Sequence, residues 1–135
     1  MALQKNTEQQ NTQTRAEIER SAVLFERRDP SVSWLAPLLA THGLDARAGI
    51  LARYVSVYEQ DGHFVTGTWL TSARRFWEFT ATIDHQSYAL IELESFEDRS
   101  DSVTVSRHLP GIRYSWGQLA LAVLEDCQSI RAGSK

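Results

Sequence analysis

The dipeptide Asp61-Gly62 separates two stretches of alternating β-branched and aromatic residues, 53–60 and 63–70. Asp-Gly suits the two central positions of a type I′ turn, because both positions need positive φ angles and this turn joins neighbouring antiparallel strands. The sequence therefore predicts a β-hairpin here, with one aromatic face. The pairs expected for a two-residue turn are Gln60 with His63, Tyr58 with Val65, Ser56 with Gly67 and Tyr54 with Trp69.

Three more strands are predicted after this hairpin, at 75–83, 88–96 and 102–107. The connection between the first two decides which side chains share a face, since a slip of one residue moves every side chain to the other face. A two-residue loop would place apolar residues opposite acidic ones, whereas a three-residue loop keeps the apolar rows together. The pairs expected for the three-residue loop are Ile83 with Ala89, Ala81 with Ile91 and Phe79 with Leu93.

Helices are predicted on both sides of the strands along the chain. Thr14 and Glu17 have the spacing of a capping box and begin an amphipathic stretch. A short apolar helix is expected over 34–40. Ser115 and Gln118 form a second capping box before a long apolar stripe. The order predicts an α+β fold, in which a five-stranded antiparallel meander (53–107) has two N-terminal helices and one C-terminal helix packed on one face.

Composition limits the chain to ordinary globular architecture. It has 135 residues, of which 42% are hydrophobic, enough for one domain, which we place at 14–131. Residues 1–13 are polar and are expected to form a disordered arm. They contain no apolar core of a signal peptide, and no apolar run reaches the length of a membrane span. We therefore expect a cytoplasmic protein that does not enter a membrane.

Charge and motif content argue against several functions. The net charge is −3, which disfavours binding to nucleic acid, and no glycine-rich phosphate loop occurs. The single cysteine, Cys127, excludes a disulfide framework within the chain and falls on the apolar stripe of the last predicted helix. No two of the four histidines have metal-ligand spacing on a helix, and His63 and His85 are expected to be exposed at turns. No metal or cofactor is predicted.

Three glutamates, Glu78, Glu92 and Glu94, fall on one face in the predicted register, with Glu78 opposite Glu94. Like charges in this position repel unless an arginine, a cation or solvent compensates. The group could be an acid/base pair or a cation site. Alternatively, it is the solvated outer face of the sheet, with arginines nearby.

A basic loop precedes the last predicted helix and contains Arg107, His108, Arg113 and Ser115. Helix N-termini attract anions through free N–H groups, and two arginines reinforce that attraction. The loop is therefore either a small anion site or a surface connection whose arginines pair with nearby acids.

The mild acidity and the amphipathic sheet favour a non-enzymatic protein–protein interaction module, such as an inhibitor, an immunity-type protein, a chaperone or an assembly adaptor. Its open sheet face or edge would hold a partner protein with a basic surface. The residues expected at this surface are Tyr54, Phe64, Phe76, Glu78, Glu92 and Glu94.

Two other interpretations stay open. One is a small-molecule-binding or enzymatic α+β domain, with a pocket between the sheet and the helices. The aromatic residues expected to line that pocket are Tyr54, Tyr58, Trp69 and Trp77. The other is a homo-oligomer that forms through an uncovered edge strand.

Overall fold

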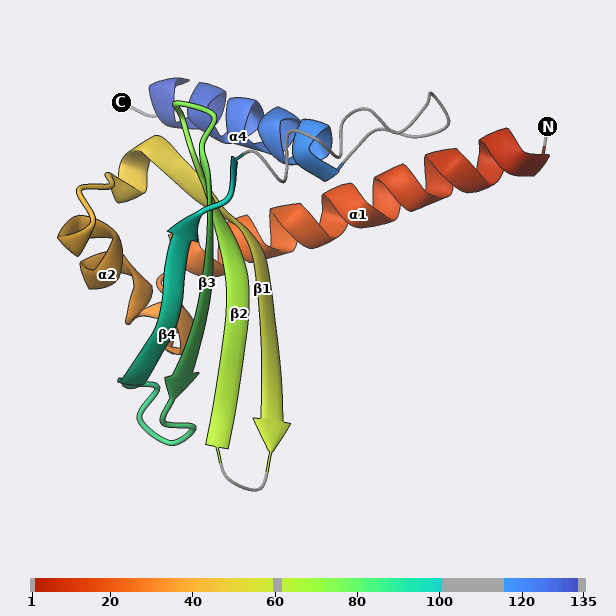
Figure 1. Cartoon of the computed structure of the whole chain (residues 1–135). Helices are drawn as coiled ribbons and strands as arrows, with labels where there is room; N and C mark the ends of the chain where they lie inside the picture. Colours follow the sequence, from red (N-terminus) through yellow and green to blue (C-terminus); the bar gives the residue numbers. More distant parts are fainter. Residues whose placement is uncertain (1, 60–61, 101–115, 134–135) are drawn as a thin grey trace.

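The computed structural model describes residues 2–59, 62–100 and 116–133 (Figure 1). Four strands form one antiparallel sheet in the order β1-β2-β3-β4, with helices before and after it in the chain. The α+β class predicted from the sequence is confirmed. The elements in chain order are α1 (Ala2–Glu26), η1 (Pro30–Val32), α2 (Leu35–Thr41), η2 (Ala46–Ala48), β1 (Gly49–Glu59), β2 (Gly62–Thr71), β3 (Phe76–Ile83), β4 (Leu90–Asp98) and α4 (Trp116–Gly133).

The first helix is longer than the capping box predicts. It begins at Ala2 instead of Thr14, so residues 2–13, which the sequence predicts to belong to a disordered arm, are helical. Glutamine, glutamate and lysine are frequent between residues 4 and 10, and all three have high helix propensity. Figure 1 shows the N-terminal part of α1 extending past β1, which is an edge strand of the sheet.

Four of the five predicted strands are present, and the fifth, at 102–107, lies outside the described residues. In the first hairpin the register differs by two residues from the expectation, because Tyr58 pairs with His63 and Glu59 with Gly62. A two-residue shift leaves every side chain on its predicted face, since side chains alternate with a period of two.

The register between β3 and β4 also differs from the prediction. Phe79 pairs with Phe96 instead of Leu93, and Ala81 pairs with Leu93. Two irregularities leave Ile91 and Glu94 without a partner on β3. The sequence predicts a ladder without interruptions, but β4 contains two β-bulges. Such bulges insert extra residues into an edge strand and often protect it from further pairing.

Helices cover both faces of the sheet, whereas the sequence suggested one. Leu70 and Trp69 are neighbours on β2 and therefore point to opposite faces. On the face of Leu70, α1 and α4 bury Ile50 and Phe76. On the face of Trp69, η1 and α2 bury further apolar side chains of the sheet. The members of this second core are Val32, Trp34, Leu35, Leu39, Leu51, Val65, Trp69, Phe79, Ala81 and Ile83.

Candidate functional site

The α1/α4 core covers only one end of its sheet face. Beyond it, side chains from all four strands form three rows across the sheet, a surface that we call the open face. The rows are Arg53, Thr68, Glu78 and Glu97; Val55, Thr66, Thr80 and Ser95; and Val57, Phe64, Thr82 and Glu92. Glu59 follows Val57 on the same face at the end of β1.

The β1 side of the open face is apolar and accessible. Val55 is 39% exposed and Val57 45% exposed, although both lie in a regular strand. Phe64, beside Val57 on β2, is half-buried. The threonines of β2 and β3 separate these apolar side chains from β4. This surface combines small apolar contacts with hydroxyl groups, which is typical of a protein contact area.

The open face also carries four carboxylates and one guanidinium. Glu59, Glu78 and Glu92 are exposed and form no ion pair within the described part of the chain. Glu97 pairs with Arg99 at 2.5 Å. The open face is therefore acidic as well as partly apolar.

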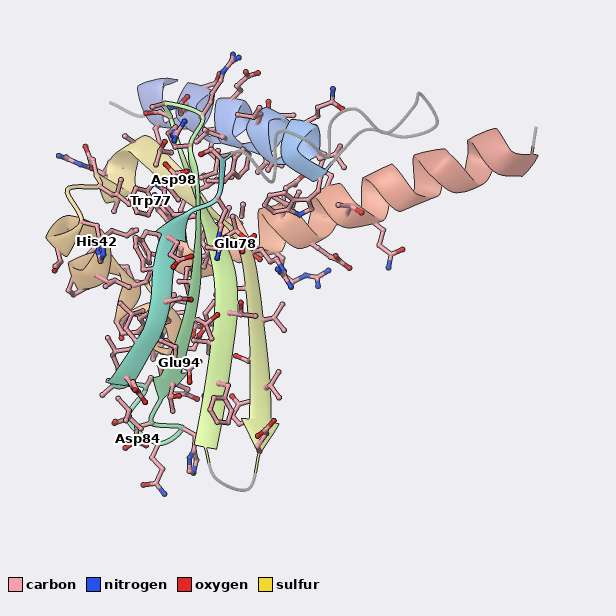
Figure 2. All side chains as sticks on the ribbon, viewed as in Figure 1. His42, Trp77, Glu78, Asp84, Glu94 and Asp98 are labelled. Atoms are coloured by element: carbon pink, nitrogen blue, oxygen red, sulfur yellow. The ribbon has the colours of Figure 1, made fainter. Side chains whose placement is uncertain are left out.

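The predicted pairing of Glu78 with Glu94 is wrong. Glu78 lies opposite Glu97, and Glu94 is one of the two unpaired residues of β4. Figure 2 shows Glu78 and Glu94 at different heights along the sheet. The three predicted glutamates therefore do not form one cluster, although Glu78 and Glu92 both belong to the open face.

The three aromatic residues expected at the binding surface have different environments. Phe64 is half-buried on the open face, whereas Phe76 is only 3% exposed and belongs to the α1/α4 core. Tyr54 lies on the opposite face, where its hydroxyl donates to the Ser31 carbonyl at 2.8 Å. Burial raises the pKa of Tyr54. Phe64 is therefore the aromatic residue of the three that is placed to contact a partner at the open face.

A groove of about 690 Å³ separates α1 from β1 at the upper end of the open face. Charged side chains of both signs line it, including Glu17 and Arg20 from α1 and Arg53 and Glu78 from the sheet. Trp116, at the start of α4, also lines the groove. The sequence suggested a pocket between the sheet and the helices, and of the residues expected to line it the groove includes Tyr54 alone. The contribution of α1 was not predicted, because α1 and β1 are far apart in the chain and no local pattern indicates their approach.

The other sheet face is filled where the sequence suggested a pocket. Trp69 is fully buried, with Phe25 against it at 4.9 Å between ring centroids. Trp77 is half-buried and stacks on Phe96 at 5.3 Å. A cavity of about 420 Å³ lies at one end of this face, beside Trp77, Arg75 and Asp98. Figure 2 shows Trp77 and His42 on the α2 side of the sheet.

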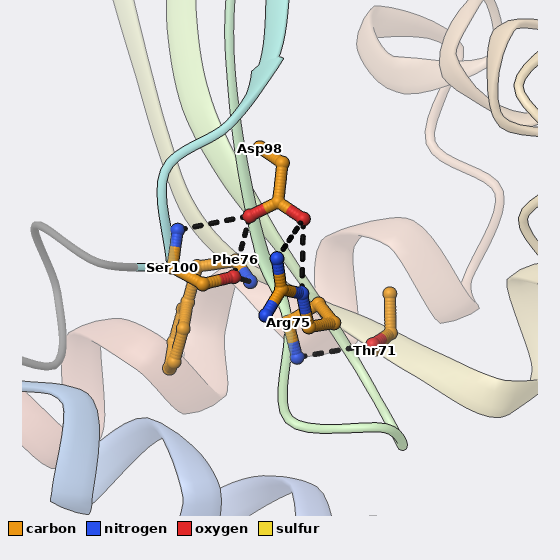
Figure 3. Close-up of polar contacts among 5 residues, drawn as sticks. All are labelled: Thr71, Arg75, Phe76, Asp98 and Ser100. Carbon is orange, nitrogen blue, oxygen red and sulfur yellow. Dashed lines mark hydrogen bonds and ion pairs between the residues drawn. The ribbon is translucent and has the colours of Figure 1, made fainter.

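A polar network joins the end of β4 to the start of β3 (Figure 3). Asp98 accepts hydrogen bonds from the Ser100 hydroxyl and amide at 2.5 and 2.9 Å, and Arg75 Nη2 lies 2.9 Å from Asp98. The Phe76 amide donates to the Ser100 hydroxyl at 3.0 Å. Burial opposes ionisation of Asp98, but Ser100 and Arg75 outweigh it and lower the pKa of Asp98. This network holds the strand ends together.

The prediction that His63 is exposed at a turn is wrong. His63 is fully buried, its Nε2 lies 3.0 Å from the Ser56 hydroxyl, and Tyr58 stacks on its ring at 4.0 Å. Burial lowers the pKa of His63. His85 is exposed in the turn between β3 and β4, as expected.

Cys127 packs against the α1/α4 core, and burial raises the pKa of its thiol. Within residues 2–59, 62–100 and 116–133, no group of histidine, cysteine, aspartate or glutamate side chains is arranged to hold a metal ion. The predicted anion site, Arg107, His108, Arg113 and Ser115, lies outside the described residues.

No protein-family model, curated protein or solved structure matches this chain. Among the described helices, none combines the length and the apolar character needed to span a membrane.

Proposed function

We propose that this protein is a non-enzymatic interaction module whose open face binds a basic segment of a partner protein. The observation that carries the proposal is the exposure of Val55 and Val57 at the β1 edge of a surface that bears several carboxylates. Contact with the valines and with Phe64 would supply affinity through burial of apolar area. The carboxylates would select a basic partner and accelerate its association.

The arrangement of charges supports a basic partner over an acidic one. Arg53 and Glu78 lie two positions apart in one row, while Glu59 and Glu92 lie at the far end of the open face. A basic partner satisfies Glu59 and Glu92, which have no partner within the described residues, whereas an acidic partner adds repulsion at both positions.

A peptide-binding measurement tests this proposal. The probe is a fluorescent decapeptide of alternating lysine and valine, and its counterpart contains glutamate in place of lysine. Binding is followed by fluorescence anisotropy at several salt concentrations. We expect the protein to prefer the basic peptide and the preference to weaken as salt rises, because exposed charges are screened.

Paired charge-reversal variants locate the binding surface. The double variant Glu78→Lys/Glu92→Lys changes the open face, and Glu19→Lys/Glu125→Lys makes the same charge change on α1 and α4, where both residues are exposed. We expect the first to weaken binding about tenfold or more and the second to change it by less than about threefold. Equal effects of the two variants, or equal binding of the two peptides, would contradict the proposal.

A pull-down from native lysate extends the test to folded partners. The wild type and the two double variants serve as baits, with circular dichroism confirming that each is folded. The expected result is a stoichiometric partner with a basic surface that the wild type and the α1/α4 variant retain and the open-face variant loses. If no captured protein depends on the open face, the proposal fails.

A further inference from the structure

The outer edge of β1 is regular over the seven residues from Arg53 to Glu59. The irregularity in this strand lies earlier, between Leu51 and Arg53. No described strand pairs with the outer edge of β1, whereas β4, the other edge strand, carries two irregularities. A straight edge with free backbone groups is able to pair with another strand, whereas bulges discourage such pairing.

The sequence of this segment is symmetric about Ser56. It reads Arg-Tyr-Val-Ser-Val-Tyr-Glu, so the residue types on the two sides of Ser56 match, except that the ends carry opposite charges. We propose that β1 pairs antiparallel with β1 of a second copy of this chain, with Ser56 opposite Ser56 on a two-fold axis.

The symmetric register brings complementary side chains together. Arg53 of one copy lies opposite Glu59 of the other, and the same pair recurs at the other end of the interface. Tyr54 faces Tyr58, and Val55 faces Val57. Opposite charges and matched β-branched or aromatic pairs are the favourable cross-strand combinations.

Other registers lose these pairs. Centring the contact on Val55 places Arg53 opposite Val57 and Glu59 opposite Leu51, so neither charge meets its opposite. Parallel pairing in register places Arg53 opposite Arg53 and Glu59 opposite Glu59, which is unfavourable at both ends. The charges therefore select the register centred on Ser56.

The surroundings of the edge agree with this contact. Val55, Val57 and Tyr58 are exposed, Tyr58 by 66%. The groove between α1 and β1 is lined by Arg20 and Arg53. In the proposed dimer, Glu59 of the second copy lies beside Arg53, at the mouth of this groove.

The second copy also completes the open face. Antiparallel pairing keeps corresponding side chains on one face, so Val55 and Val57 of the two copies form a continuous apolar strip. The inference does not rest on the proposed function, because it follows from the backbone edge and the sequence symmetry of β1, although Val55, Val57 and Glu59 belong to both surfaces.

Sedimentation velocity over about 1 to 100 μM tests the dimer, since a contact smaller than about 1,200 Å² belongs to the weak, transient class. We expect the wild type to dimerise reversibly in this range. Arg53→Glu and Glu59→Arg each place like charges opposite one another at both ends and should raise the dimer Kd about tenfold or more. A wild type that stays monomeric over the whole range overturns the proposal.

Mixing the two variants provides the matched control. A heterodimer of Arg53→Glu with Glu59→Arg restores opposite charges at both ends, as does the homodimer of the double variant Arg53→Glu/Glu59→Arg. We expect both to associate within about threefold of the wild-type affinity. If the single variants dimerise like the wild type, or if the mixture does not associate, this interface is wrong.

Disulfide cross-linking tests the register without altering these charges. In a Cys127→Ala background, Ser56→Cys should form a covalent dimer, because opposed Cα atoms lie about 4.5–5.5 Å apart in an antiparallel pair. Arg53→Cys alone should not form a covalent dimer, because residue 53 of one copy lies about 20 Å along the strand from residue 53 of the other. A mixture of Arg53→Cys and Glu59→Cys should cross-link. Cross-linking of Arg53→Cys alone, without cross-linking of Ser56→Cys or of the mixture, would contradict the Ser56 register.

Discussion

The ring of Phe79 on β3 lies directly over Gly67, its partner on β2. A Cβ atom at residue 67 would come 2.4 Å from Phe79 Cζ and 2.4 Å from the backbone oxygen of Arg53 on β1. Glycine therefore permits a close approach of three strands at the centre of the sheet. The same ring also contacts Trp34 edge-on, at 5.6 Å between centroids.

We predict that Gly67→Ala destabilises the protein by about 2–3 kcal/mol, the upper part of the range for overpacked cores. Phe79 could turn aside, but the Arg53 carbonyl belongs to the β1 backbone and cannot move without disturbing the hairpin. The free energy of unfolding in urea measures the effect.

Gly43→Ala is the control for this prediction, since nothing lies within 4 Å of the added Cβ and only the positive φ of 71° at Gly43 opposes the change. Gly43→Ala should cost about 1 kcal/mol. If Gly67→Ala loses no more stability than Gly43→Ala, the close approach at Gly67 would be contradicted.

The Ser100 hydroxyl gives a second prediction about stability. Its removal in Ser100→Ala takes away the acceptor of the buried Phe76 amide. An unsatisfied buried N–H group costs about 1–3 kcal/mol, so the variant should be less stable by that amount. Ser72→Ala, on an exposed turn residue, should change stability by less than about 0.5 kcal/mol. Equal urea midpoints for the two variants would show that the network does not hold the strand ends.

His63 gives the protein a predictable response to pH. Burial, with a smaller contribution from the charge of His85, lowers the pKa of His63 in the folded state. As the pH falls below about 6.5, the unfolded chain binds a proton at this position before the folded protein does, so the free energy of unfolding decreases. The loss should continue until the pH reaches the folded pKa of His63.

Unfolding in urea at pH 7.5 and pH 5.5 measures this dependence. The variant His63→Gln should remove much of the difference between the two pH values. His85→Gln should retain most of the pH dependence, because His85 is exposed and its charge lowers the pKa of His63 less than burial does. A pH dependence that survives unchanged in His63→Gln would contradict the assignment.

Local patterns predicted the four described strands, the faces of β1, β2 and β3, and the amphipathic last helix. The alternation that places Trp69 inside also places Thr68 on the other face, and both positions follow from a period of two. The register of β4 could not be predicted in this way. Ile91 and Glu94 look like ordinary members of an alternating strand, and only their position relative to β3 shows that they lie at bulges.

The candidate surface was predictable only in part. Glu78, Glu92 and Phe64 belong to the open face, whereas Phe76 is buried because α1 and α4 pack over its end of the sheet. Alternation assigns Phe64 and Phe76 to the same face of their paired strands. Which of them a partner can reach depends on where the helices end, and that information is not local.

The sequence alone determined the α+β class, the alternation along β1, β2 and β3 within the predicted strands, and the symmetry of residues 53–59, because each depends on neighbours within a few positions. The tertiary structure decided that helices cover both faces and that β1 is an edge strand. It also decided that His63 is buried and that α1 and β1 enclose a groove. These features arise from packing between segments distant in the chain, where burial of apolar area and steric fit outweigh local preference.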